Sequence, residues 1–324
     1  MKIAVAEIDS VGNDISYDGL AKLGDVACYK DKVTAENAKE RLGNGEEILC
    51  INKSKITKEL LDNAPDLKLI CEFATGFDNV DIAECSKRGI KVANVAGYST
   101  MSVAQHTFAL LFYLMEDLKG YDEFVKSGEY AAQAYFSKVD VPFHEIDGMT
   151  WGIIGMGNIG RKVAQIATAF GAKVIFYSAS GRTAHNDMDS EYEMVTYDEL
   201  LERSDVISLH CPLSDKTRNL IDADALKKMK KTAYLINVAR GPVVNEQDLT
   251  EALLNDEIAG AGLDVLSVEP MAKDNPLLKI QDSKKLFITP HMAWASVEAR
   301  SRCVDEVCKN ILAFMNGKSR SWIN

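Results

Sequence analysis

The sequence predicts an α/β protein with two doubly wound parallel-sheet domains and a cleft between them. Three observations lead to this fold class. The chain has 324 residues, enough for two domains that each bury a core. Short apolar runs alternate with amphipathic segments, as expected for parallel sheets covered by helices on both faces. A glycine-rich turn, WGIIGMGNIGR, stands near the middle of the chain at 151–161.

The first part of the chain predicts a flavodoxin-like domain. Apolar runs rich in Ile and Val predict strands at Ile3–Ala6, Val26–Tyr29, Glu47–Ile51, Leu67–Phe73 and Ile90–Val95. Between them, helices are expected at Tyr17–Leu23, Ala35–Leu42, Thr57–Asn63 and Asp81–Arg88. The last helix of the chain, Ser296–Met315, has no strand left to follow and should return to this domain. We therefore expect a discontinuous substrate domain at 1–98 and 291–324.

Residues 99–290 predict a Rossmann nucleotide domain. A long helix is expected from Ser99 to Asp117, followed by an irregular stretch at 118–141 that serves as the crossover and a dimer surface. Strands are expected at Trp151–Ile154, Lys173–Tyr177, Val206–His210, Ala233–Val238, Gly260–Val265 and Leu286–Thr289. Helices are expected at Asn158–Phe170, Tyr197–Arg203, Ala223–Met229 and Glu246–Leu254. Six strands with the glycine turn on the first make a full dinucleotide-binding domain.

The glycine turn has the spacing GxGxxG between an apolar strand and a helical pattern. Gly155 would allow the tight turn, Gly157 would let backbone approach a pyrophosphate, and Gly160 would let the helix pack close to the strand. The helix N-terminus would then offer N–H groups to the phosphates. This context raises the motif well above a chance match.

Composition excludes several classes of function. A formal net charge of −11 argues against nucleic acid as a partner, because such binders need a basic surface. The most apolar stretch, 103–115, is too short to span a bilayer, and the start MKIAVAEID has no signal-peptide pattern. The seven cysteines and five histidines show no metal-ligand spacing, so no metal site is expected. A cytoplasmic location is expected, with the cysteines reduced.

The choice of nicotinamide cofactor depends on the end of the second nucleotide-domain strand. NAD sites usually carry an acid about 20 residues beyond the glycines, where it binds the ribose 2′-hydroxyl. Here Ser178 stands 18 residues after Gly160, and Arg182 follows in a polar loop. An arginine can pair with a 2′-phosphate, so NADP(H) is favoured over NAD(H), with use of both as the next alternative. The plain alternative is that Arg182 is a solvated loop charge.

Three segments at predicted strand ends carry residues suited to chemistry. NVARGPVVN supplies Arg240, GLDVLSVEP supplies Asp264 and Glu269, and TPHMAWA supplies His291. Each residue alone is more simply a surface or loop side chain. At successive strand ends beyond a dinucleotide fold they form a candidate site. His106 lies within the long predicted helix, where a satisfied buried histidine is favoured over a catalytic one.

Over nearly its whole length the sequence resembles the D-isomer-specific 2-hydroxyacid dehydrogenase family. The resemblance is carried by GMGNIG, NVARGPVVNE, GLDVLSVEP and TPHMAWAS in the family's order and spacing. The stretches GYSTMSVAQHTFALL and PHMAWAS look most similar to the glycerate dehydrogenase or hydroxypyruvate reductase branch. Ser178 departs from the family pattern, which usually has an acid there, and this puts strict NAD dependence in doubt.

The resemblance implies a role for each matching residue. Arg240 would clamp the substrate carboxylate and carbonyl, Glu269 would be the partner of the histidine, and His291 would be the general acid and base. Backbone at Thr75 and Gly76 would bind the substrate carboxylate. The residues implied at the cofactor, besides the three glycines, Arg240 and His291, are Val103, Asn158, Ile159, Cys211, Pro212, Val238, Ala239, Asp264 and Ala293.

The expected reaction is reduction of a small 2-keto acid, hydroxypyruvate or glyoxylate, to the D-2-hydroxy acid, and its reverse. A protonated His291 can donate to the carbonyl oxygen as hydride reaches C2, while Arg240 polarises the carbonyl. The alternatives are another D-2-hydroxyacid dehydrogenase of the D-lactate type and a dinucleotide-sensing, corepressor-like binding protein. The resemblance also implies a homodimer.

Overall fold

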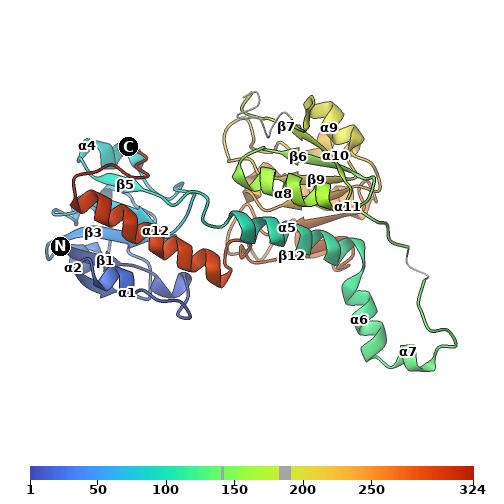
Figure 1. Ribbon diagram of the computed structural model, residues 1–324, viewed down its shortest axis with the longest axis horizontal. Helices are drawn as coiled ribbons and strands as arrows, with labels where there is room; N and C mark the ends of the chain where they lie inside the picture. Colours follow the sequence, from blue (N-terminus) through green and yellow to red (C-terminus); the bar gives the residue numbers. More distant parts are fainter. Residues whose placement is uncertain (140–141, 182–190) are drawn as a thin grey trace. The chain divides into compact units, whose positions relative to one another are not determined.

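The structure, a computed structural model, describes residues 1–139, 142–181 and 191–324. The chain divides into two units, coloured along the sequence in Figure 1. The terminal unit consists of Met1–Ser99 and Trp294–Asn324, and the central unit is Thr100–Ala293. The two divisions fall one and three residues after the predicted domain boundaries. His291, predicted to open the returning segment of the first domain, therefore belongs to the central unit.

The terminal unit contains a five-stranded parallel sheet in the order β2-β1-β3-β4-β5. Its strands are β1 (Lys2–Val5), β2 (Asp25–Cys28), β3 (Glu46–Ile51), β4 (Leu69–Glu72) and β5 (Lys91–Ala93). Its helices are α1 (Asp18–Ala21), α2 (Ala38–Leu42), α3 (Lys58–Asp62), α4 (Ile82–Lys87) and α12 (Val297–Met315), with a 3₁₀ turn at Ile8–Ser10. This strand order is the flavodoxin-like one.

Alternate residues along these strands enter two separate cores, as the two-residue period of a strand requires. On β3, Ile48 and Cys50 pack on one side, where α12 lies, while Leu49 and Ile51 pack on the other with α2 and α3. One stripe of α12 is buried in the first of these cores, through Ala299, Cys303, Val304, Val307 and Ile311. In Figure 1, α12 is the red helix drawn with the blue strands of this unit. The returning helix thus completes the unit that begins at the N-terminus.

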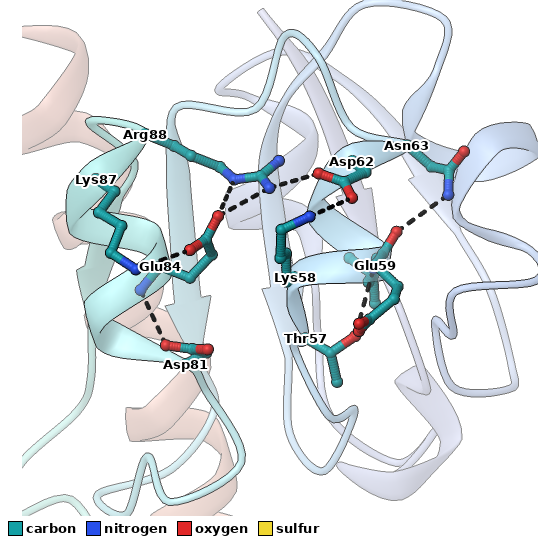
Figure 2. Close-up of polar contacts among 10 residues, drawn as sticks. Thr57, Lys58, Glu59, Asp62, Asn63, Asp81, Glu84, Lys87 and Arg88 are labelled. Atoms are coloured by element: carbon teal, nitrogen blue, oxygen red, sulfur yellow. Dashed lines mark hydrogen bonds and ion pairs between the residues drawn. The ribbon is translucent and has the colours of Figure 1, made fainter.

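Helices α3 and α4 are joined at their surface by Arg88, as Figure 2 shows. The guanidinium lies 2.5 Å from Asp62 Oδ1 on α3 and 2.9 Å from Glu84 Oε1 on α4. The Arg88 hydrogen bonds hold the pKa of both carboxyl groups below their usual range. Thr57 and Asp81 cap the two helices, each accepting a backbone N–H three residues later. These surface contacts link the C-terminal ends of the two helices.

The central unit contains a seven-stranded parallel sheet in the order β12-β11-β10-β9-β6-β7-β8. The strands are β6 (Thr150–Ile154), β7 (Lys173–Tyr177), β8 (Glu193–Met194), β9 (Val206–Leu209), β10 (Tyr234–Asn237), β11 (Gly260–Leu263) and β12 (Leu286–Ile288). Strand order reverses between β6 and β9, as in a Rossmann sheet. Two parallel, doubly wound sheets confirm the predicted fold class. The sequence missed β8, which has only two residues.

Helix α5 (Thr100–Met115) and helix α8 (Asn158–Ala169) pack together on one side of this sheet. The Phe108 ring of α5 lies 4.8 Å, centroid to centroid, from that of Trp151 on β6. A Cβ added at Gly262 on β11 would lie 2.9 Å from Leu110 Cβ, so this glycine lets α5 sit directly on the strand. Helices α9 (Tyr197–Arg203), α10 (Ala223–Lys228) and α11 (Glu246–Leu254) contribute to a second core with the same strands.

The prediction of an irregular stretch at 118–141 was wrong for its first part, where α6 (Leu118–Lys126) and α7 (Glu129–Ala132) lie, whereas residues 133–139 contain no helix or strand. Asp117 caps α6 by accepting the Gly120 N–H. Ion pairs four residues apart, Lys119 with Glu123 and Asp122 with Lys126, support the helix along its exposed side. Among the described residues, no helix combines the length and apolarity needed to cross a membrane.

Candidate active site

The predicted site residues of the central unit gather after the carboxyl ends of its parallel strands. In open α/β sheets, ligands bind outside these ends where strand order reverses, here between β6 and β9. The residues that follow strand ends of this sheet are Gly155, Gly157, Ser178, Cys211, Pro212, Val238, Ala239, Arg240, Asp264, Glu269, His291 and Ala293. They lie along one edge of the sheet.

The glycine turn between β6 and α8 has the geometry its spacing predicts. Gly155 has a φ of +99°, and a Cβ there would lie 2.7 Å from the backbone nitrogen of Cys211. A Cβ at Gly160 would lie 2.3 Å from the Gly155 carbonyl oxygen. At Gly157, which caps α8, a Cβ would meet no described atom within 4 Å. The turn therefore leaves open space before the N-terminus of α8, and this fits a dinucleotide pyrophosphate.

The residues predicted to contact the adenosine follow β7 and β9. Ser178 is partly exposed, and its Oγ lies 3.3 Å from Ser180 Oγ. Arg182, the other residue behind the NADP(H) prediction, lies outside the described residues. Cys211 is buried, and burial raises the pKa of its thiol to about 11, so it is no reactive thiolate. The Pro212 carbonyl accepts the Thr217 hydroxyl at 2.7 Å, which fixes the turn after β9.

Arg240 stands in a turn that a buried amide holds together after β10. The fully buried Asn237 accepts the Ala239 N–H at 3.0 Å and donates to the Arg240 carbonyl at 3.0 Å. The Arg240 Nη1 donates to the Ala239 carbonyl at 2.8 Å. A Cβ added at Gly241 would lie 1.9 Å from the carbonyl carbon of Leu266. The Arg240 turn thus packs directly against the loop after β11.

Asp264 organises the segment Thr289–Ala293, which follows β12. Its carboxylate is buried and accepts the Met292 and Ala293 N–H groups, each at 2.8 Å, and the Thr289 hydroxyl at 2.6 Å. Its backbone carbonyl accepts the His291 N–H at 2.8 Å. The resemblance places this acid at the nicotinamide. In the structure, its carboxylate shapes the segment that carries His291.

His291 and Glu269 form a pair at the sheet edge. Nδ1 of the imidazole lies 2.7 Å from Glu269 Oε2, and Glu269 Oε1 accepts the Leu266 N–H at 2.9 Å. The side chains are 26% and 36% exposed, so both remain within reach of a ligand. His291 has a φ of +53°, a left-handed conformation that costs a non-glycine residue on the order of 1 kcal/mol. The surrounding bonds hold it there.

Three further predicted residues, Val103, Thr75 and Gly76, belong to other elements of the fold. Val103 is buried on α5 of the central unit. Thr75 and Gly76 belong to the terminal unit, after β4, where the Thr75 hydroxyl donates to the Val95 carbonyl at 2.8 Å and its carbonyl accepts from Asn94. Thr75 and Gly76 remain expected substrate contacts.

Three residues of the site environment were not predicted from the sequence, namely Ser102, Asn237 and Thr289. His106 was expected to be a satisfied buried histidine, and its Nε2 lies 2.9 Å from Thr289 Oγ1 and 3.5 Å from Asp264 Oδ1. Burial lowers the pKa of His106 below its usual value. The sequence feature that could have indicated these contacts is the pair of polar residues Ser102 and His106, which lie one helical turn apart on the apolar helix α5. Within the described residues, no group of three or more His, Cys, Asp or Glu could hold a metal.

Comparison with known proteins places this architecture in a family. Residues 108–293 match the family described as "D-isomer specific 2-hydroxyacid dehydrogenase, NAD binding domain". The chain is 36% identical to a hydroxypyruvate reductase of Blautia hydrogenotrophica over 314 residues, 96% of this chain and 95% of the relative.

Two solved structures have the same fold over almost their whole length. One is an acyclic imino acid reductase in complex with NADPH and D-Arg, with a TM-score of 0.86, 32% identity and full coverage of both chains. The other is D-lactate dehydrogenase from Aquifex aeolicus with NAD and lactic acid, with a TM-score of 0.82, 32% identity, and coverage of 97% of this chain and 96% of the other. This chain belongs to the D-isomer specific 2-hydroxyacid dehydrogenase family, as an NAD(P)-dependent enzyme.

Proposed function

We propose that this enzyme reduces a small 2-keto acid, hydroxypyruvate or glyoxylate, to the D-2-hydroxy acid and catalyses the reverse oxidation. The observation that carries the proposal is the 2.7 Å contact between His291 Nδ1 and Glu269 Oε2. Glu269 belongs to the loop after β11, and this loop packs against the Arg240 turn. The similarity to a hydroxypyruvate reductase supports the substrate class.

In this proposal three side chains of the central unit act on the substrate. Glu269 holds the imidazole by Nδ1, so His291 exchanges its proton with the substrate oxygen through Nε2. Arg240 has a permanently charged, planar guanidinium that binds the carboxylate and polarises the carbonyl. The reduced nicotinamide, when bound, supplies hydride to C2. The proton from His291 then completes the hydroxyl group, and the oxidation runs in the opposite sense.

The described residues fit a dinucleotide along the sheet edge. The glycine turn and the first residues of α8, Asn158 and Ile159, would hold the pyrophosphate. The adenosine side would contact Ser178, Cys211 and Pro212. The residues proposed on the nicotinamide side are Val103, Val238, Ala239, Arg240, Asp264, His291 and Ala293. Asp264 contributes there by holding the Met292 and Ala293 backbone in place.

We retain NADP(H) as the favoured cofactor, with NAD(H) as the alternative. Ser178 places no carboxylate where a 2′-phosphate would lie. The acyclic imino acid reductase, which is 32% identical to this chain, was solved in complex with NADPH. Comparison of kcat/KM for NADPH and NADH in the native enzyme, Arg182→Ala and Ser178→Asp tests this choice. We expect both variants to shift the preference toward NADH. A strong NADH preference of the native enzyme that Arg182→Ala leaves unchanged would refute it.

The terminal unit is proposed as the substrate domain, through Thr75 and Gly76, and the enzyme as a homodimer. Large apolar side chains stand exposed in the stretch after α7, where Tyr135, Phe136 and Val139 are 80%, 91% and 84% accessible. Such a patch favours a protein contact. Sedimentation of the native chain and of Phe136→Ser should show a dimer that the substitution weakens. All seven cysteines are free thiols, which fits the proposed cytoplasmic location.

The decisive experiment is a panel of 2-keto acids tested with each reduced cofactor. Glyoxylate, hydroxypyruvate, pyruvate and bulkier keto acids are compared by kcat/KM. We expect glyoxylate or hydroxypyruvate to give the highest kcat/KM. A maximum with pyruvate would favour the D-lactate type, whose solved example from A. aeolicus has the same fold. Tight cofactor binding without turnover of any keto acid would favour a dinucleotide sensor.

A further inference from the structure

Helix α5 contacts the segment Thr289–Ala293 at two points one helical turn apart. Ser102 Oγ donates to the Ala293 carbonyl at 2.6 Å, and His106 Nε2 lies 2.9 Å from Thr289 Oγ1. Residues four apart on a helix point to the same side, so both bonds come from one side of α5. The contacts reach the two ends of the segment that carries His291 in its middle.

The direction of the hydrogen bonds follows from the donors that are present. The Thr289 hydroxyl donates its only hydrogen to Asp264 Oδ1, at 2.6 Å. Its oxygen can then only accept from His106, which must carry its hydrogen on Nε2. Burial lowers the pKa of His106, and the contact with Thr289 places a ring hydrogen on Nε2. The result is a one-way chain from His106 through Thr289 to Asp264.

This series of hydrogen bonds leads to Asp264, which binds the backbone on both sides of His291. The Asp264 carboxylate accepts the Met292 and Ala293 N–H groups, and its backbone carbonyl accepts the His291 N–H. His291 keeps a left-handed φ of +53°, which persists only where neighbouring bonds fix it. Ser102 and His106 add two fixed points from a helix that is itself packed on β11 through Gly262.

We infer that Ser102 and His106 are positioning residues for His291, which α5 uses to clamp the segment Thr289–Ala293. They do not touch the substrate. Their part is to hold the imidazole where Glu269 meets Nδ1 and Nε2 meets the substrate. This inference rests on the proposed function, because it takes His291 as the proton donor.

The test uses variants that remove or keep each hydrogen bond. Thr289→Val and His106→Leu break the chain, whereas Thr289→Ser keeps the hydroxyl and His106→Gln keeps an N–H donor near the position of Nε2. In the cofactor-free protein, amide hydrogen exchange at Met292 and Ala293 should be at least about tenfold faster in the first pair than in the native chain. In steady state, kcat should fall by about tenfold or more while the cofactor Kd stays within about twofold.

Thr107→Val is the matched control, because Thr107 is a buried threonine on the same helix whose hydroxyl donates only to the Val103 carbonyl, at 2.8 Å. It should leave exchange and kcat unchanged, and Thr289→Ser and His106→Gln should restore both to within about threefold of native. Unchanged exchange in Thr289→Val and His106→Leu would overturn the clamp. Faster exchange with native kcat would overturn the positioning role. If the native protein reduces no keto acid, the proposed function fails. The amide exchange rates at Met292 and Ala293 then show by themselves whether α5 clamps the segment.

Discussion

The glycine turn after β6 is shaped mainly by residues near it in sequence, although Gly155 also lies against the backbone of Cys211, whereas the segment Thr289–Ala293 after β12 is held by distant residues. In the turn, Gly155 and Gly160 meet each other across five residues. In the segment, the backbone around His291 is held by Asp264, and Thr289 is held by His106, which lies 183 residues away in the chain. Both regions stand at the same sheet edge.

The difference shows how each region depends on the rest of the fold. The turn itself is set by a strand, glycines at fixed spacing and a helix that follow one another in the sequence. The histidine segment takes its shape from α5 and from the loop after β11, so it exists only once those elements have packed. The turn proposed to hold the cofactor is thus encoded mainly by local sequence, and the segment proposed to transfer the proton is encoded by tertiary structure.

Arg240→Ala should have the largest effect and would test whether distant strand ends form one site. Loss of the guanidinium removes both carboxylate binding and carbonyl polarisation, so KM should rise and kcat should fall, lowering kcat/KM by about 10³-fold. Arg240→Lys keeps the charge without the planar fork and should be intermediate. Steady-state kinetics with the preferred keto acid measures both. A rise in KM with native kcat would mean that Arg240 only binds substrate.

A pair of glycine substitutions sharpens the local half of the comparison. Gly160→Ala should lower the free energy of unfolding by about 2 kcal/mol, because its Cβ would lie 2.3 Å from the Gly155 carbonyl oxygen. The methyl group of Gly157→Ala would enter open space, so the free energy of unfolding of this variant should stay within about 1 kcal/mol of the native value. It should nevertheless weaken dinucleotide binding by about tenfold, since the methyl group enters the space proposed for the pyrophosphate. Urea unfolding and cofactor titration separate the two effects, and equal stability losses would contradict this account.

His210, whose backbone lies against the glycine turn, should make the free energy of unfolding depend on pH. Its backbone carbon would lie 2.8 Å from a Cβ at Gly155, and burial lowers the pKa of its imidazole to about 3. The unfolded chain binds this proton near pH 6.5, so stability falls as pH drops below 6.5. Between pH 7 and pH 5 this one group should cost at most about 2 kcal/mol.

His210→Asn should flatten that part of the pH profile of the unfolding free energy. His144→Asn, at an exposed histidine, is the control and should not change it. Parallel pH profiles for the native chain and His210→Asn would show that His210 is not the group responsible.

The smallest effect is expected for a surface contact between residues 26 apart, Arg88 and Asp62. Their side chains are 25% and 48% exposed, so water and salt screen the pair. Arg88→Ala should cost less than about 1 kcal/mol of unfolding free energy. A loss of 2 kcal/mol or more would mean that long-range polar bonds matter here even without burial.

Sequence alone predicted the fold class, most strands and the glycine turn, because these depend on local periodicity and on glycine spacing. The pairing of Glu269 with His291 was implied by the family resemblance, and in the structure His291 Nδ1 lies 2.7 Å from Glu269 Oε2. The roles of both residues remain predictions. Polar side chains on an apolar helix look alike whether water or a distant partner satisfies them, so the bonds of Ser102 and His106 could not be foreseen. Helix α6 was missed although its charges recur four residues apart.

The most direct test of the central claim is keto-acid reduction by His291→Ala, measured together with cofactor affinity. We expect a kcat at least about 10²-fold below native, because the proposed proton donor is gone, with the cofactor Kd within about threefold. A kcat within a few-fold of native, at the same cofactor affinity, would contradict the claim that this segment supplies the proton.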